Sequence, residues 1–182
     1  MVVGAALLAG LVLRSQVEGR TATFQDKASG FSISYPATWG ASASLKELML
    51  KVEDQRTDSA FKTSLAVEKR GLDPQSPPTL QQLVDRRVAQ QGTLTAFHLL
   101  SSREETNRAL FAGAKAMRQE YAYVVQPIDQ TRRASVPVVV HAVDYIVITK
   151  NNAFFITLAA PEGAFDDASG VLDAIIGSVR VP

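Results

Sequence analysis

Hydrophobic and polar residues alternate in several short segments of the chain, and a period of two is typical of β-strands with one buried face. The first two segments cover residues 23–25 and 31–35, with a turn-like stretch from Lys27 to Gly30 between them. Pro36 ends the second segment, because proline lacks the amide hydrogen that a β-ladder needs. The other alternating segments predict strands over residues 48–52, 64–69, 97–104, 114–125, 138–149 and 153–160.

The last two predicted strands are joined by Lys150, Asn151 and Asn152. Asparagine tolerates the positive φ angles of a tight hairpin turn, and the segments on both sides are rich in apolar residues. This pattern predicts a β-hairpin.

Two other segments have apolar residues at spacings of three and four, which is the period of an amphipathic helix. The first follows a proline-containing loop, has Thr79 as its N-cap candidate and ends at Gly92. The second covers residues 162–176 and is ended by Gly177. The first helix leaves a face that we expect to meet water, made of Asp85, Arg86, Arg87, Gln90 and Gln91.

The predicted order is strands, one helix, strands and one helix, without the βαβ alternation of a parallel sheet. Such an order predicts an α+β fold, with an antiparallel β-sheet flanked by helices. The chain has 182 residues, of which 46% are hydrophobic, so one domain with a real core is expected. We assign this domain to residues 22–182.

The first thirteen residues carry no charge and end before Arg14, which predicts an N-terminal apolar helix that anchors the protein in a membrane. As a helix they would span about 20 Å, less than the ~30 Å hydrocarbon core of a bilayer. Residues 14–21 are then a polar linker. Two alternatives stay open, a cleaved signal peptide and a helix within the core. Small residues four apart indicate close contact with a partner helix in the membrane, namely Ala5, Ala6, Ala9 and Gly10.

Nineteen basic and eighteen acidic side chains leave a formal net charge of +1. With so little net charge, no summed field attracts the chain to nucleic acid, and we expect no nucleic-acid partner. The absence of cysteine excludes disulfides, thiolate metal sites and a cysteine nucleophile.

Residues 31–39, Phe-Ser-Ile-Ser-Tyr-Pro-Ala-Thr-Trp, resemble the opening motif of PsbP-like domains. In the second half, the strand at 145–148, the asparagine turn, the strand at 154–158 and the helix up to Ser178 are similar to the C-terminal signature of that family. The resemblance covers residues 21–182. It implies an α-β-α sandwich, and it implies a binding or assembly role, since the family includes the extrinsic protein of photosystem II, the Ran-binding import factor Mog and many bacterial lipoproteins. The role of the photosystem protein does not carry over, because an apolar segment replaces its N-terminal extension.

Candidate catalytic residues are few. His98 and His141 each stand in a strand-like segment without a second ligand at a metal-binding spacing, which favours structural histidines. Asp144 follows His141 by three residues, so in a strand the two side chains point to opposite faces. Asp166 and Asp167 are expected in the first turn of the last helix, where the helix dipole favours carboxylates. We therefore predict no catalytic site, no metal site and no cofactor.

Two arginine pairs are candidates for contact with another protein, because arginine is enriched at interfaces. Arg132 and Arg133 lie in the long loop between residues 126 and 137, and the other pair lies on the first helix. For both pairs the alternative is simple contact with solvent. The single tryptophan, Trp39, follows a strand end and is expected to cover one edge of the core.

These observations predict an accessory or assembly subunit of a membrane protein complex, with integral membrane subunits and the lipid bilayer as partners. Two alternatives are a free-standing anchored module that binds a small ligand, and an enzyme that uses His98, His141 or Asp144. By resemblance to bacterial relatives the domain is expected on the extracytoplasmic side, although Arg14 and Arg20 favour the cytoplasmic side.

Overall fold

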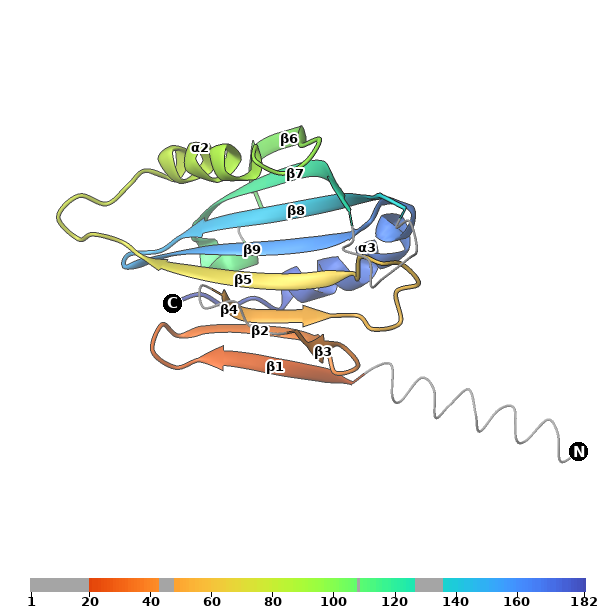
Figure 1. The fold of residues 1–182 in the computed structure, drawn as a ribbon. Helices are drawn as coiled ribbons and strands as arrows, with labels where there is room; N and C mark the ends of the chain where they lie inside the picture. The colour runs from red at the N-terminus through yellow and green to blue at the C-terminus, as the bar shows by residue number, and fades with distance from the viewer. Residues whose placement is uncertain (1–19, 43–47, 108, 127–135) are drawn as a thin grey trace, which may run out of the picture.

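The computed structural model describes residues 20–42, 48–107, 109–126 and 136–182 (Figure 1). Within these ranges seven antiparallel strands form one sheet, in the order β3-β4-β5-β9-β8-β7-β6. Two further strands form a separate antiparallel hairpin, β1 (Thr21–Asp26) and β2 (Phe31–Pro36). The strands of the large sheet are β3 (Gly40–Ala41), β4 (Leu48–Glu53), β5 (Ser64–Gly71), β6 (His98–Glu104), β7 (Lys115–Val125), β8 (Val138–Ile148) and β9 (Asn152–Pro161).

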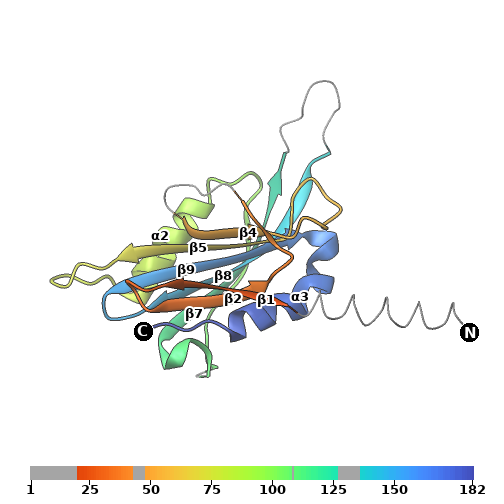
Figure 2. The same ribbon diagram turned by 90° about the horizontal axis from the view of Figure 1, so that it is seen from below.

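The sheet has helices on both faces, so the molecule is a three-layered sandwich (Figures 1 and 2). Helix α2 (Leu80–Gln91) packs Leu83 and Val84 against Ile146 and Phe155 on one face. Helix α3 (Glu162–Gly177) packs on the other face together with the β1–β2 hairpin. The structure therefore confirms the predicted α+β class and the antiparallel sheet flanked by helices.

The central strands β8 and β9 are buried on both faces, which explains their nearly continuous apolar sequence. Because side chains alternate along a strand, Phe154 and Ile156 enter the core under α3, whereas Phe155 lies under α2. The β8–β9 hairpin is confirmed. Neither Asn151 nor Asn152 has the predicted positive φ angle, and the turn is closed by hydrogen bonds between Thr149 Oγ1 and the backbone of Asn152.

Helix α2 begins as its sequence predicts. Thr79 Oγ1 accepts a hydrogen bond from the amide of Gln82, and Gln82 Oε1 accepts one from the amide of Thr79, which completes a capping box. Helix α3 differs from the prediction at its start. It begins at Glu162, so Asp166 and Asp167 lie in the second turn and only Glu162 is near the positive end of the dipole.

A short 3-10 helix, η1 (Leu110–Gly113), was not predicted from the sequence. It contains Phe111 and Ala112 at positive φ angles of 55° and 52°, a conformation that is strained for residues other than glycine. The Phe111 ring is almost fully buried and packs against Tyr145, at 5.7 Å between ring centroids. Burial of this ring in the core offsets the backbone strain.

The strand registers bring several chain segments together at one end of the sheet. Thr21 pairs with Pro36, Glu53 with Ser64, and Pro161 with Val140 near the start of β8. We call this end the loop end of the sheet. The chain enters the domain there, α3 begins there, and β7 and β8 both reach it. The opposite end carries the β8–β9 hairpin.

The predicted N-terminal apolar helix at residues 1–13 lies outside the described residues, as does most of the predicted linker. Strand β1 begins at Thr21, the last residue of that linker. Within the described ranges, no helix is both long and apolar enough to cross a membrane.

Candidate functional site

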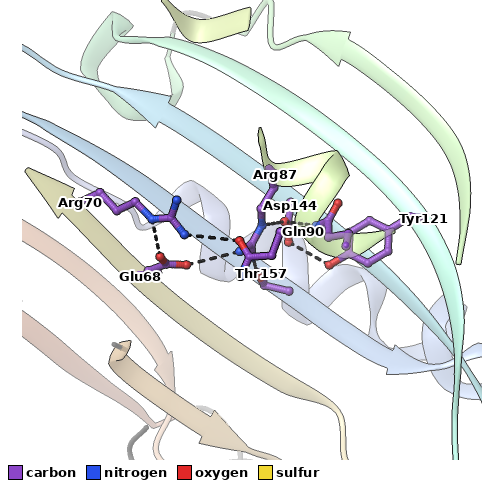
Figure 3. A network of polar contacts seen from close by, with 8 residues as sticks. Glu68, Arg70, Arg87, Gln90, Tyr121, Asp144 and Thr157 are labelled. Carbon is purple, nitrogen blue, oxygen red and sulfur yellow. Dashed lines mark hydrogen bonds and ion pairs between the residues drawn. The ribbon is translucent and has the colours of Figure 1, made fainter. Parts of the chain in front are cut away.

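Polar side chains of the described residues gather in three places: a buried network under α2, a cluster around His141 on the α3 face, and a cleft at the loop end of the sheet. The network is centred on Asp144 of β8, whose side chain is fully buried. Asp144 accepts hydrogen bonds from Arg87 Nε at 2.7 Å and from the Tyr121 hydroxyl at 3.2 Å (Figure 3). It accepts a third from Gln91 Nε2 at 2.5 Å. A buried carboxylate with three donors is well satisfied.

Arg87 extends this network to the neighbouring strands. Its guanidinium also donates to Thr157 Oγ1 at 3.0 Å and to Glu68 Oε2 at 3.3 Å, and Glu68 in turn accepts a hydrogen bond from Arg70 at 2.6 Å (Figure 3). The guanidinium stacks over the Phe155 ring, 5.3 Å from its centroid. Arg87 therefore ties α2 to β5, β8 and β9.

Electrostatics in the network favour fixed charges rather than proton transfer. Burial acts to lower the pKa of Arg87, but the charge and hydrogen bond of Asp144 outweigh it, and the pKa of Arg87 is raised. Burial, reinforced by the Asp144 charge, raises the pKa of Tyr121 far above its usual range. Arg87 therefore stays charged and Tyr121 stays neutral near neutral pH, and we interpret the network as a structural latch that holds α2 on the sheet.

This network corrects part of the sequence prediction. Arg87 and Gln91 were assigned to the solvent face of α2, but the Arg87 side chain is only 13% exposed and Gln91 is buried. The helical spacing already indicated that both residues lie on the buried face of α2, because Arg87 lies four residues after Leu83 and Gln91 lies seven residues after Val84. Arg86, by contrast, is exposed as predicted.

The two histidines lie in different environments. His141 lies on the α3 face of β8 and stacks on Phe165, at 3.8 Å between ring centroids. Its ring nitrogens lie 2.9 Å from Glu120 Oε1 and 3.2 Å from Glu162 Oε2. The sequence spacing missed these carboxylates because they come from β7 and α3. Asp144 points to the opposite face, as predicted, and His98 is exposed on the edge strand β6.

His141 forms a cluster with Phe165, Glu120 and Glu162, and this His141 cluster fixes the start of α3 to the sheet. Burial acts to raise the pKa of Glu120, but hydrogen bonds from Arg118 and His141 outweigh it and lower that pKa. Arg118 Nη1 lies 2.6 Å from Glu120 Oε2, so this carboxylate has cationic or polar partners on both oxygens. Glu162 joins the cluster from the first helical turn. In the described ranges, no group of three or more histidine or acidic side chains is placed to hold a metal ion.

A cleft with a volume of about 860 Å³ opens at the loop end of the sheet. Its floor includes Pro36, Trp39 and Pro161, and one wall is a stripe of α3 that includes Ala168 and Val171. The opposite wall is the loop between β4 and β5, from Asp54 to Ser59. Trp39 is 6% exposed, so it packs in the core as predicted while its remaining surface lines the cleft.

Charged groups are placed on both walls of the cleft. On the loop, burial acts to raise the pKa of Asp54, but hydrogen bonds from Arg56 outweigh it and that pKa is lowered. Lys62 donates to the Thr57 carbonyl oxygen at 2.6 Å and holds the loop closed. Among the described residues, three acidic side chains and one arginine line the cleft, so their charges sum to a net negative value.

The remaining candidates from the sequence lie outside the described residues. These are the small residues Ala5, Ala6, Ala9 and Gly10 and the loop arginines Arg132 and Arg133. The strands that flank the arginine loop, β7 and β8, end and begin at the loop end of the sheet, where Val125 pairs with Val138.

The chain matches no protein-family model and no curated protein in sequence. Its fold is similar to that of cyanobacterial PsbP (CyanoP) from Synechocystis sp. PCC 6803, with a TM-score of 0.64, 13% identity, and coverage of 89% of this chain and 92% of that chain. LpqN, involved in cell envelope biogenesis of Mycobacterium tuberculosis, is similar with a TM-score of 0.56, 11% identity, and coverage of 90% and 91%. The Saccharomyces cerevisiae Ran-binding protein Mog1p aligns with a TM-score of 0.49, 10% identity, and coverage of 89% and 95%.

At such low identity these similarities concern the fold alone. The similarity to CyanoP confirms the PsbP-like fold that the motifs in residues 31–39 and 145–178 indicated. Function has to be argued from the residues of this chain.

Proposed function

We propose that this protein is a non-catalytic accessory or assembly subunit of a membrane protein complex. In this proposal residues 1–13 hold it at the bilayer, and the loop end of its domain contacts an integral membrane subunit on the extracytoplasmic side. The observation that carries the proposal is the position of the cleft beside the point where the chain enters the domain. The Arg20 carbonyl accepts a hydrogen bond from the Ala37 amide, between the cleft residues Pro36 and Trp39.

This position matters because an anchor at residues 1–13 would keep the loop end close to the membrane surface. Neighbouring membrane subunits would then meet the cleft and the base of the β7–β8 loop first. The non-catalytic role is supported by the pairing of the charged groups in the network, since the carboxylates of Asp144 and Glu68 are balanced by the guanidinium groups of Arg87 and Arg70. The PsbP-like fold is compatible with such a binding role.

The test is mild-detergent solubilisation of native membranes, followed by affinity purification of the tagged protein and mass spectrometry. We expect co-purification of integral membrane subunits in a fixed ratio. A Leu8→Arg/Leu11→Arg variant should leave the membrane fraction, because charges in an apolar segment oppose insertion. An Ala9→Leu/Gly10→Leu variant stays apolar but blocks close helix contact, so it should stay in the membrane and lose the subunits.

Purification of the wild-type protein alone, as a monomer, would contradict the accessory-subunit role. Sidedness can be tested separately, because the chain has no cysteine. An Ala174→Cys variant places one thiol at an exposed position of α3. A membrane-impermeant maleimide should label this thiol in intact cells; labelling only after lysis would place the domain in the cytoplasm.

One observation favours a second candidate function. The cleft volume of about 860 Å³ falls within the range of small-molecule sites. A free-standing anchored module that binds a small ligand would therefore also use this cleft. Recovery of the protein as a monomer with a bound small molecule, detected by native mass spectrometry, would favour this candidate over the first.

A further inference from the structure

We propose that the cleft binds an extended peptide segment in which an apolar side chain stands next to a lysine or arginine. This inference rests on the proposed function in one respect, that the segment belongs to a neighbouring membrane subunit. Peptide binding by the cleft is a property of the domain and can be measured without that subunit.

The shape of the cleft comes from small and rigid residues. Along α3 its wall is formed by Gly163, Ala164 and Ala168, whose short side chains leave the space beside the helix open. Val171 continues this stripe and is 40% exposed, so part of its apolar surface faces the cleft. The stripe gives an apolar side chain a surface to cover.

Proline and tryptophan form the bottom of the cleft. Pro36 and Pro161 have fixed φ angles, and Trp39 is held in the core, so the floor is preformed. A preformed apolar surface lowers the entropic cost of binding for an incoming side chain. Rigid aromatic and proline surfaces are also the kind on which extended peptides dock.

The charge of the cleft determines which residue of the bound peptide can stand next to that apolar side chain. Asp58 on the loop wall and Asp167 on the helix wall line the cleft from opposite sides, and neither has a hydrogen-bond or ion-pair partner among the described residues. Asp54 is engaged by Arg56, so its charge is already compensated. A cation that enters the cleft therefore meets two uncompensated carboxylates, whereas an anion is repelled.

The same charges exclude other occupants. Phosphate, anionic lipid headgroups and nucleic acid carry negative charge and are repelled by the carboxylates. A purely apolar ligand would leave both carboxylates without a cationic partner. In a peptide with an apolar residue beside a basic one, the apolar side chain can pack on the floor while the basic side chain pairs with the carboxylates of the walls.

The experiment is a selection of random heptapeptides displayed on phage, with the full-length protein in mild detergent as bait. We expect enrichment of peptides that carry lysine or arginine next to an apolar residue. A Gly163→Tyr bait serves as the counter-selection, because an added Cβ at this position meets nothing within 4 Å and the ring can fill the cleft. Enrichment without basic residues, or equal enrichment on the Gly163→Tyr bait, would overturn the inference.

An enriched peptide is then synthesised and titrated against the protein, with the emission of Trp39 as the readout, since the chain has one tryptophan. Asp58→Asn and Asp167→Asn should each weaken binding by about 1.5-fold to 5-fold, the range for an exposed ion pair. Asp166→Asn makes the same charge change on the same helix outside the cleft and should leave binding unchanged. Equal effects of Asp167→Asn and Asp166→Asn would refute a specific role for the cleft carboxylates.

The two proposals fail differently. Peptide binding together with recovery of the protein free of membrane subunits would leave the cleft inference standing and refute the accessory role. Recovery with membrane subunits, but without selective peptide enrichment, would refute the cleft inference alone.

Discussion

Replacement of Arg87 by methionine should destabilise the domain strongly, because it removes one partner of a buried ion pair. Asp144 is fully buried, and its Oδ2 atom lies 2.7 Å from Arg87 Nε. Removing one member of such a pair leaves an uncompensated buried charge and costs about 3–5 kcal/mol. Gln91 and Tyr121 still donate to Asp144 in the variant, so we expect a loss near the lower end, about 3 kcal/mol.

Urea unfolding followed by circular dichroism measures this loss as a change in the free energy of unfolding. For a domain of this size, about 1 kcal/mol corresponds to a shift in melting temperature of roughly 2–4 °C, so a fall of roughly 6–12 °C is expected. The neighbouring Arg86→Met change is the matched control. Arg86 is exposed, and its loss should change the free energy of unfolding by less than about 0.5 kcal/mol.

A second variant separates the ion pair from the other contacts of Arg87. In Arg87→Met/Asp144→Leu both buried charges are removed together, and we expect the double variant to be more stable than Arg87→Met alone. If Arg87→Met costs no more than Arg86→Met, or if the double variant loses the sum of both single losses, the latch interpretation of the network is refuted.

Three further predictions concern separate parts of the molecule. Hydrogen bonds from Lys69 and Ser29 lower the pKa of Asp26 to about 2. The contribution of the Asp26 carboxylate to stability is therefore present above about pH 4 and is lost as the pH falls toward 2. A pH series of melting temperatures should show that Asp26→Asn removes this acid dependence. Thr79→Ala removes the N-cap of α2 and should cost about 1 kcal/mol in urea unfolding, with Thr79→Ser as the conservative control. Burial and the Asp144 charge raise the pKa of Tyr123 to about 12, and the pKa values of Tyr121 and Tyr145 are raised as well. Absorbance at 295 nm near pH 11 should therefore show far fewer tyrosinates in the folded protein than in the protein unfolded by guanidine.

Local patterns in the sequence were sufficient for most of the elements. Alternation predicted the described strands except the two-residue β3, and spacings of three and four predicted the two described helices α2 and α3, because each pattern reflects which side of one element meets the core. Thr79 was a correct N-cap prediction, since capping depends on neighbours within one turn. The positions of Asp166 and Asp167 were wrong by one turn, because helix α3 starts directly after Pro161 without a side-chain cap.

The strand order, the network under α2 and the cleft depend on contacts between distant segments, and a single sequence does not give these directly. Arg87 reaches Asp144 and Thr157, which are 57 and 70 residues away along the chain. The cleft is assembled from three separate regions, near residues 36–39, 54–59 and 161–171. Trp39 was correctly predicted as a core residue, but its second role as part of the cleft floor followed only from the fold.

Photo-crosslinking from the cleft tests the central claim, that the loop end of this domain contacts an integral membrane subunit. A photoreactive amino acid replaces Val171 in the cleft wall, and in a control protein it replaces Lys150 in the hairpin turn at the opposite end of the sheet. After irradiation of native membranes, the account predicts a crosslink to an integral membrane protein from position 171 and none from position 150. Equal crosslinking from both positions, or no membrane protein crosslinked from position 171, would contradict it.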